Sequence, residues 1–490
     1  MQTRRVAGAA IALAAATLSI APATAASVAP QEARACAWSA KIDPNLFNVA
    51  FPDQAAHYWS LVLPAVPGTS LVLRGRFPHS RYISFTSYDA QLRSADGIND
   101  TRIQPDPGSS NPFLVGASRT VPDDRRAYTV HVVRGQRPAQ PAPNTLYTGS
   151  ADGTHQGQAF TLLYRDYRQD RGLGDDGGVG LPSVSIASAA GEVPVPTCPF
   201  PDTPDTGINA ALAGAAAPGR SATPDTTPPV WHKFYNLPTS GALIAADLVP
   251  PAAGATAVTT RTGAGGYLDN PDNKYVFTAV TPYEGSVVII HALLPTTPAT
   301  YDGEKVMTGA QLRYWSMCSN EFATQRFYGC ILDDQLQLDA SRHYTIVVSA
   351  KADRPANTRA GCGIDWLPAG GAPDTVLIER NMLADPAFHQ SIQVAQQGHE
   401  KADLGAYYPA AAYTTTASVE ALGCHAAGPA DAAVTRVVRH PVSAAPPPSH
   451  AAVTTPGRLA ATGGLSAAAA GTGLLAGAAA LRARRRRATR

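Results

Sequence analysis

The feature that most constrains how this chain folds is an internal repeat. The two halves share five sequence blocks in the same order: residues 58–73 with 275–290, 81–89 with 313–321, 128–133 with 344–348, 144–149 with 365–370, and 162–166 with 377–381. The second pair shares the pattern Arg-Tyr-x-Ser-x-x-Ser-x-acid, beginning at Arg81 and Arg313. The first pair places a turn at Gly68 or Gly285 between two apolar segments. Five blocks in one order predict a diverged tandem duplication.

Each block has the composition of β-strands. Val, Ile, Leu, Tyr, Phe and Thr dominate short runs that are bounded by Gly, Pro, Asp or Asn, and no interior segment carries a long apolar period of 3.6 residues. A copy of about 190 residues can bury a substantial core. We therefore predict an all-β chain with two tandem antiparallel jelly-roll-like β-sandwich domains, related by internal duplication.

Both ends of the chain carry targeting patterns. Arg4 and Arg5 precede an apolar run over residues 6–20 and the small residues 23–25, which predicts a secretory signal peptide cleaved after Ala25. At the other end, the motif Leu459-Ala460-Ala461-Thr462-Gly463 is followed by an apolar stretch over 465–481 and an arginine-rich terminus. Such a stretch spans roughly 25 Å as a helix, which is barely enough to cross a bilayer.

This tail resembles the cell-wall sorting signals of high-GC Gram-positive bacteria, in their Leu-Ala-x-Thr-Gly form. The resemblance implies that a sortase-type transpeptidase cuts between Thr462 and Gly463 and joins the threonine to peptidoglycan. The alternative is an ordinary C-terminal membrane anchor with the arginines on the cytoplasmic side. In both cases we expect a secreted protein held at the cell envelope, which meets the membrane only through this segment.

The expected organisation follows from these signals and from composition. Two segments rich in Pro, Ala, Ser and Thr read as a linker and a wall spacer. The predicted order is a signal peptide (1–25), a first sandwich (26–198), a linker (199–230), a second sandwich (231–432), a spacer (433–458) and the sorting signal (459–490).

Net charge argues against nucleic acid as a partner. The two targeting segments hold eight of the 39 Lys and Arg and none of the 37 Asp and Glu, so the rest of the chain is mildly acidic. No basic patch interleaved with aromatics remains between them. The partners we expect are the transpeptidase, peptidoglycan and, as candidates, a glycan or another surface protein.

The six cysteines are interpreted as three disulfides, because an even number in an exported chain favours pairing and no Cys-x-x-Cys spacing occurs. Cys318 and Cys330 stand on strands predicted to be antiparallel neighbours, which brings their Cα atoms within disulfide reach. Cys36 and Cys198 flank the first copy and would join its entry to its exit. Cys362 and Cys424 then form the third pair.

Several blocks also resemble a widespread bacterial domain family of unknown function. The residues that carry the resemblance are Tyr314-Trp315-Ser316, Asp333-Asp334, Tyr344-Thr345-Ile346 and the 365–369 turn, with weaker matches at 106–113 and 144–147. The family implies paired jelly-roll sandwiches and is silent on chemistry. Asp365 departs from it, because the family tends to have Asn there.

No catalytic, cofactor-binding or metal-binding residue is predicted. The chain has no Gly-x-Ser-x-Gly elbow and no His-Glu-x-x-His motif. Its densest acidic cluster, at Asp166, Asp170, Asp175 and Asp176, could hold calcium but lacks EF-hand spacing, so a solvated turn is favoured. His389 and the pair His399-Glu400 are interpreted as surface residues.

The aromatic residues are expected mostly in cores, because strands bury one face. They are Trp38, Tyr58, Trp59, Tyr82, Tyr88, Tyr314, Trp315 and Trp366. Two functions remain open. The favoured one is a non-catalytic surface protein with binding or structural sandwiches. The alternative is an exported enzyme acting on a polysaccharide or small molecule, with carboxylates such as Asp333, Asp334 or Asp365 paired in a cleft.

Overall fold

A computed structural model describes most of the two repeats. The described residues are 36–42, 44, 50–62, 67–89, 92–152, 161–199, 228–236, 240, 243, 266, 268–281, 286–306, 309–321, 325–370 and 375–424. The predicted signal peptide, nearly all of the linker, the wall spacer, the sorting motif and the apolar stretch 465–481 lie outside these residues.

The first repeat forms two stacked five-stranded sheets. One has the order β1-β2-β8-β4-β5 and the other β10-β9-β3-β6-β7. The strands are β1 (Ala40–Ile42), β2 (Ala56–Val62), β3 (Ser70–Arg76), β4 (Ser80–Tyr88), β5 (Ser94–Asn99), β6 (Ala127–Gln136), β7 (Thr145–Gly149), β8 (Thr161–Gln169), β9 (Ser183–Ser188) and β10 (Gly191–Val195), with a 3₁₀ turn η1 (Asp123–Arg125).

The second repeat has a five-stranded and a four-stranded sheet. Their orders are β11-β12-β18-β14-β15 and β17-β16-β13-β19. The strands are β11 (His232–Lys233), β12 (Asn273–Val280), β13 (Ser286–Leu293), β14 (Tyr314–Glu321), β15 (Phe327–Leu332), β16 (His343–Ser349), β17 (Asp365–Pro368), β18 (Thr375–Met382) and β19 (Ala410–Thr415). Short helical segments are η2 (Thr300–Asp302), η3 (Lys351–Asp353), α3 (Glu400–Leu404), η4 (Gly405–Tyr407) and α4 (Thr416–Ala421).

The strand orders confirm the predicted all-β fold and its duplication. The orders β1-β2-β8-β4-β5 and β11-β12-β18-β14-β15 correspond strand for strand, and the five sequence blocks fall on equivalent strands. The sheets are not wholly antiparallel, because β6 pairs with β7, and β16 with β17, in parallel. Gly68 has the left-handed φ of 74° that its turn requires, and Gly285 lies outside the described residues.

Each sandwich has its own core between its two sheets. The first core includes Trp59, Phe85 and Tyr164 of one sheet facing Leu73 and Val130 of the other. The second core has the same arrangement: Trp315 of one sheet faces Ile290 and Ile346 of the other, and all three side chains are fully buried. Large side chains alternate along these strands with those of the opposite face, as the pleat requires.

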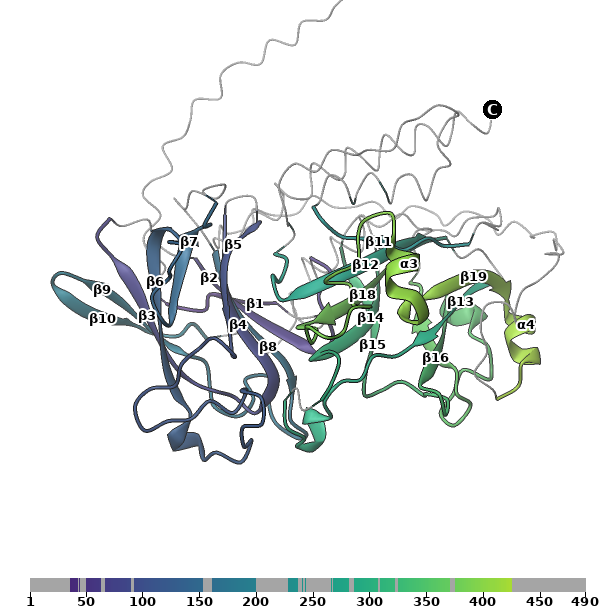
Figure 1. The fold of residues 1–490 in the computed structure, drawn as a ribbon, viewed down its shortest axis with the longest axis horizontal. Coiled ribbons are helices and arrows are strands. Elements are labelled where there is room, and N and C mark those ends of the chain that lie inside the picture. Colours follow the sequence, from purple (N-terminus) through teal and green to yellow (C-terminus); the bar gives the residue numbers. More distant parts are fainter. Residues whose placement is uncertain are drawn as a thin grey trace, which may run out of the picture.

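The opposite faces of the two five-stranded sheets are also covered, because the sandwiches pack against each other there. Every residue of β4, β14 and β18 is buried, which happens only when both faces of a strand are covered. Figure 1 shows the first repeat (purple to blue) and the second (teal to yellow-green) side by side, with β4 and β8 facing β14, β15 and β18.

Three disulfides join the pairs expected from the sequence. Cys318–Cys330 links paired positions of β14 and β15, with Cα atoms 4.0 Å apart. Cys36–Cys198 joins the entry and exit of the first repeat, where Ala37 also exchanges backbone hydrogen bonds with Pro196 and Cys198. Cys362–Cys424 ties the segment before β17 to the end of α4.

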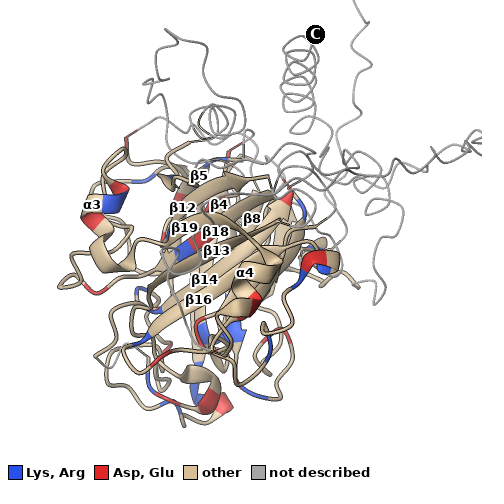
Figure 2. Ribbon diagram, turned by 90° about the vertical axis from the view of Figure 1, so that its right-hand side faces the viewer, with Lys and Arg blue, Asp and Glu red and all other residues tan. Residues whose placement is uncertain are grey.

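Residues of both charge signs are distributed along the ribbon. In the view of Figure 2 most Lys, Arg, Asp and Glu lie in loops and short helices, with blue and red interspersed. Within the described part of the chain, no helix is both long and apolar enough to cross a membrane.

Glu379 on β18 is an acidic side chain inside the second core, and it gives a testable pH dependence. It is 3% exposed, and burial raises the pKa of its carboxyl from 4.5 to about 8. The folded state therefore keeps a proton that the unfolded chain releases above pH 4.5, and stability falls as the pH rises from there through about 8. We expect Glu379→Gln to flatten this slope and to gain about 3 kcal/mol at pH 7.

Denaturant unfolding between pH 4.5 and 8.5 measures this effect. Glu192→Gln is a matched control, because Glu192 is exposed on β10 and pairs with Arg74. Parallel stability curves for the Glu379→Gln variant and the wild type would show that the carboxyl is not held neutral.

Candidate ligand-binding site between the two sandwiches

Two buried ion pairs cross between the sandwiches reciprocally. The Arg81 guanidinium of the first repeat donates two hydrogen bonds to the Asp333 carboxylate of the second, at 2.7 and 2.6 Å. The Arg313 guanidinium of the second donates to Asp100 of the first, at 2.6 Å. Burial disfavours the charged form of Arg81, but Asp333 outweighs it and raises the pKa of the guanidinium. Arg81 and Arg313 occupy equivalent positions in the two repeats, so the interface has pseudo-two-fold symmetry.

Two loops are held in the same reciprocal manner. Arg380 of β18 donates from Nη2 to the Phe51 carbonyl before β2, at 2.7 Å. Arg165 of β8 donates from Nη2 to the Leu268 carbonyl before β12, at 2.5 Å. Phe51 and Leu268 both have left-handed backbones, with φ of 53° and 59°. Each repeat thus presents one arginine to the loop of the other.

Tyrosines fill the space between these polar contacts. The Tyr82 hydroxyl donates to Asp272 at 2.7 Å, and the Tyr314 hydroxyl donates to Asp53 at 2.7 Å, each across the interface. The Tyr167 ring packs edge-on against both tyrosine rings, with centroids 5.6 Å away. The facing sheets therefore share a buried network of tyrosines and carboxylates.

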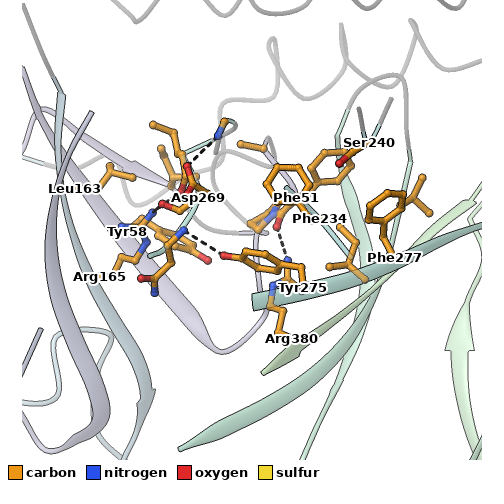
Figure 3. Close-up of a pocket in the computed structure, with 18 of the residues that line it drawn as sticks. Phe51, Tyr58, Leu163, Arg165, Phe234, Ser240, Asp269, Tyr275, Phe277 and Arg380 are labelled. Atoms are coloured by element: carbon orange, nitrogen blue, oxygen red, sulfur yellow. Dashed lines mark hydrogen bonds between the residues drawn. The ribbon is translucent and has the colours of Figure 1, made fainter. Parts of the chain in front are cut away.

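A pocket opens beside this network, between the outer faces of β2 and β8 on one side and β12 and β18 on the other. Figure 3 shows Tyr58, Leu163 and Arg165 on the first side, facing Tyr275, Phe277 and Arg380 on the second. Its remaining wall is largely apolar and includes Phe51, Phe234, Val376 and Ile378. Concave, mostly apolar sites with a few polar groups are typical of small-molecule binding.

Arg165 is the most unusual residue of the pocket. Its side chain is 1% exposed, and its hydrogen bonds go to the hydroxyls of Thr86 and Tyr88 and to backbone carbonyls. Within the described residues it forms no ion pair with a carboxylate, and its Nε has no acceptor. Burial disfavours the charge, but surrounding tyrosine oxygens outweigh this and raise the pKa of the guanidinium.

Arg380 has a counterion, in contrast to its counterpart. Its Nε lies 3.6 Å from the Asp53 carboxylate, which also accepts the Ser316 hydroxyl at 2.6 Å. Arg380 and Asn270 both line the pocket, and among the described residues Arg380 Nη1 and Asn270 Nδ2 are buried donors without an acceptor. The residues of the pocket wall therefore include buried N–H groups that no described residue of the protein satisfies.

The carboxylates considered for catalysis have structural partners. Asp333 is bound to Arg81, and the neighbouring Asp334 pairs with Arg168 at 2.7 Å. Asp365 accepts hydrogen bonds from Gln337 at 2.9 and 3.0 Å. None of the three is among the residues that line the pocket.

The acidic cluster is dispersed by the fold. Asp166 points into the first sandwich and is fully buried, and Asp170 pairs with Arg119. Asp175 pairs with Lys41, while Asp176 accepts the backbone N–H of Gly178.

Among the described residues, one group of potential metal ligands has its ligand atoms close together: Asp53, Cys318 and Cys330. The two sulfurs form a disulfide, so they are not thiolate ligands. His389 and His399 are exposed, whereas Glu400 is buried and accepts the backbone N–H of Lys233 at 2.8 Å.

The aromatic residues divide between cores and the interface. Trp38, Trp59 and Trp315 lie in sandwich cores, as predicted. Tyr82, Tyr88 and Tyr314 are also buried, but they are buried between the sandwiches and not within one. Tyr58 lines the pocket, and Trp366 is partly exposed beneath the Arg354 guanidinium, 4.6 Å from its ring centroid.

Arg165 and Arg380 were not predicted as site residues from the sequence, although the repeat contains a signal for them. Both stand at the same place in the fifth block, and strand alternation places them opposite the core residues Leu162 and Tyr164, or Leu377. An arginine kept at the same outward position in both copies indicates a shared role, although the pattern does not show what covers it.

The comparisons with known proteins do not indicate what this chain does. No protein-family model and no curated protein matches this sequence. Among solved structures, an uncharacterised protein from Burkholderia cenocepacia aligns with a TM-score of 0.41 and 13% identity, covering 78% of this chain and 83% of that one. A protein from Vibrio parahaemolyticus aligns with a TM-score of 0.35 and 10% identity, covering 76% and 92%. Likenesses at this level carry no argument about chemistry.

Proposed function

We propose that this chain is an exported, wall-anchored surface protein that binds a small molecule in the pocket between its two sandwiches. The observation that carries the binding role is the pocket itself, an apolar concavity at a pseudo-two-fold interface. Its wall contains a buried arginine that has no counterion in the part of the chain that the structure describes. Three disulfides suit an oxidising compartment outside the cytoplasm. Binding is favoured over catalysis because Asp333, Asp334 and Asp365 are engaged elsewhere.

The anchoring part of the proposal rests on the sorting motif. Replacing Thr462 with Ala removes the residue whose carbonyl would be joined to peptidoglycan. We expect the protein to move from the covalent wall fraction to the membrane or the medium, with a loss of tenfold or more from wall digests. Ala461→Ser, at the variable position, is the control. Equal amounts of wild type and the Thr462→Ala variant in the wall digest would refute sorting.

The binding part is tested with small apolar fragments of neutral, anionic and cationic character. Saturation-transfer NMR on the full chain should detect fragments that compete for one site. Ile378→Trp places a larger ring in the pocket wall and should abolish their signals, whereas Val193→Trp on exposed β10 should leave them unchanged. Signals that persist in the Ile378→Trp variant, or no binding by any fragment, would reject the pocket as a ligand site.

A further inference from the structure

We infer that the ligand of this pocket is a small organic monocarboxylate with an apolar body, and that Arg165 receives its carboxylate. The inference rests on the proposed binding function and adds the chemical class of the ligand.

The charge around the pocket favours a single negative charge. Arg380 is already balanced by Asp53. Asp269, which also lines the pocket, accepts the backbone N–H of Gly266 and the Ser94 hydroxyl, and its negative charge acts on the ammonium of Lys274. Of the two arginines in the lining, Arg165 is the one without a carboxylate partner among the described residues, although an isolated buried cation is costly to desolvate. One anionic group would balance it, whereas a dianion would leave excess negative charge.

The available donors fit a carboxylate. The loop whose Leu268 and Asp269 carbonyls accept from Arg165 continues directly into Asn270. The Asn270 side-chain oxygen is already used by the Tyr82 hydroxyl, so its Nδ2 is the group left to donate. Arg165 Nε, which is also buried, is the donor of the guanidinium that has no acceptor among the described residues. A guanidinium and an amide N–H together can satisfy both oxygens of a carboxylate.

The opposite wall accounts for the apolar body. Phe277, Val376 and Ile378 form an apolar cluster on the outer face of β12 and β18, with Phe234 and Tyr275 packed beside it. Figure 3 places Phe234 and Phe277 across the pocket from Arg165. A ligand that spans the pocket would bind its charged end at Arg165 and bury its apolar end against these rings.

Calorimetry on the full chain with 3-phenylpropanoate, 3-phenylpropanamide and propanoate tests the inference without any variant. The carboxylate should bind at least tenfold more tightly than the amide, because a charge-assisted hydrogen bond is lost with the charge. It should also bind at least tenfold more tightly than propanoate, which lacks the ring. Equal affinity for acid and amide, or for the acid with and without its ring, would overturn the inference.

Variants then assign the residue. Arg165→Met should reduce affinity for the carboxylate at least tenfold and leave that for the amide unchanged, while Arg74→Met, at an exposed arginine on β3, should change neither. If Arg165→Met does not fold, Asn270→Leu provides the same acid-against-amide comparison. Fragments that bind in the pocket while the acid shows no preference would leave the proposed function standing and refute only the ligand class.

Discussion

Arg81→Met is expected to lower the free energy of unfolding by about 3–5 kcal/mol, because it leaves the Asp333 carboxylate buried without its cation. Both side chains are inaccessible to solvent, and the guanidinium donates two short hydrogen bonds to the carboxylate. Arg313→Met should have an effect of similar size through Asp100, since the pair is repeated across the pseudo-two-fold. Denaturant unfolding followed by tryptophan fluorescence measures both.

The control is another arginine–carboxylate pair of good geometry that lies on the surface. Arg74 and Glu192 form two hydrogen bonds of 2.8 and 3.0 Å but are close to half exposed. Arg74→Met should therefore change stability by less than about 1 kcal/mol. The double variant Arg81→Met with Asp333→Leu should recover much of the loss, because no buried charge is left unpaired. A change below about 1 kcal/mol for Arg81→Met itself would contradict the role given to this pair.

Removing the Cys36–Cys198 disulfide, by replacing both cysteines with Ala, should cost about 5 kcal/mol in the chain-entropy description. The bridge closes a loop over a sequence separation of 162 residues, so it restricts the unfolded chain strongly. The folded state also keeps local support there, because Ala37 and Cys198 remain hydrogen-bonded through their backbones. Thermal and denaturant unfolding under non-reducing conditions give the difference.

The comparison is the Cys318–Cys330 bridge, which spans only 12 residues between adjacent strands. Its loop-closure contribution is smaller, about 3 kcal/mol. The variant lacking Cys36–Cys198 should also release the first residues of the repeat to protease before the rest of the sandwich. If the variant lacking Cys36–Cys198 loses no more stability than the variant lacking Cys318–Cys330, loop closure does not determine how much these bridges stabilise the fold.

Much of the architecture was predictable because it is encoded locally and repeated. Strand blocks, turn residues and their order appear twice, and a strand pairing inferred for one copy applies to the other. The Cys318–Cys330 pair was predicted from strands expected to be antiparallel neighbours, and the two cysteines occupy paired positions of β14 and β15. The parallel pairing of β7 with β6, and of β17 with β16, was not predicted, because the direction of a strand within a sheet leaves no local sequence pattern.

The candidate site was not predictable in the same way. Tyr82 and Tyr314 were expected to be buried in a core, and both are. Alternation could not show that this core lies between the sandwiches, because it does not reveal that both faces of β4 and β14 are covered. Asp333 was considered as a catalytic acid, yet its partner Arg81 lies 252 residues away in the chain. Contacts at such separations depend on how two finished sandwiches dock.

The sequence by itself therefore determined the all-β class, the duplication and the cysteine pairs, because strand propensity, turns and order along the chain are local properties. Only the tertiary structure decided that the outer faces of the two large sheets meet, and that Arg165 lies buried there with no carboxylate partner among the described residues. The physical reason is that burial and charge pairing belong to surfaces brought together by docking. An arginine that reads as solvent-facing along its strand becomes a candidate ligand-binding group only when a second sandwich covers it.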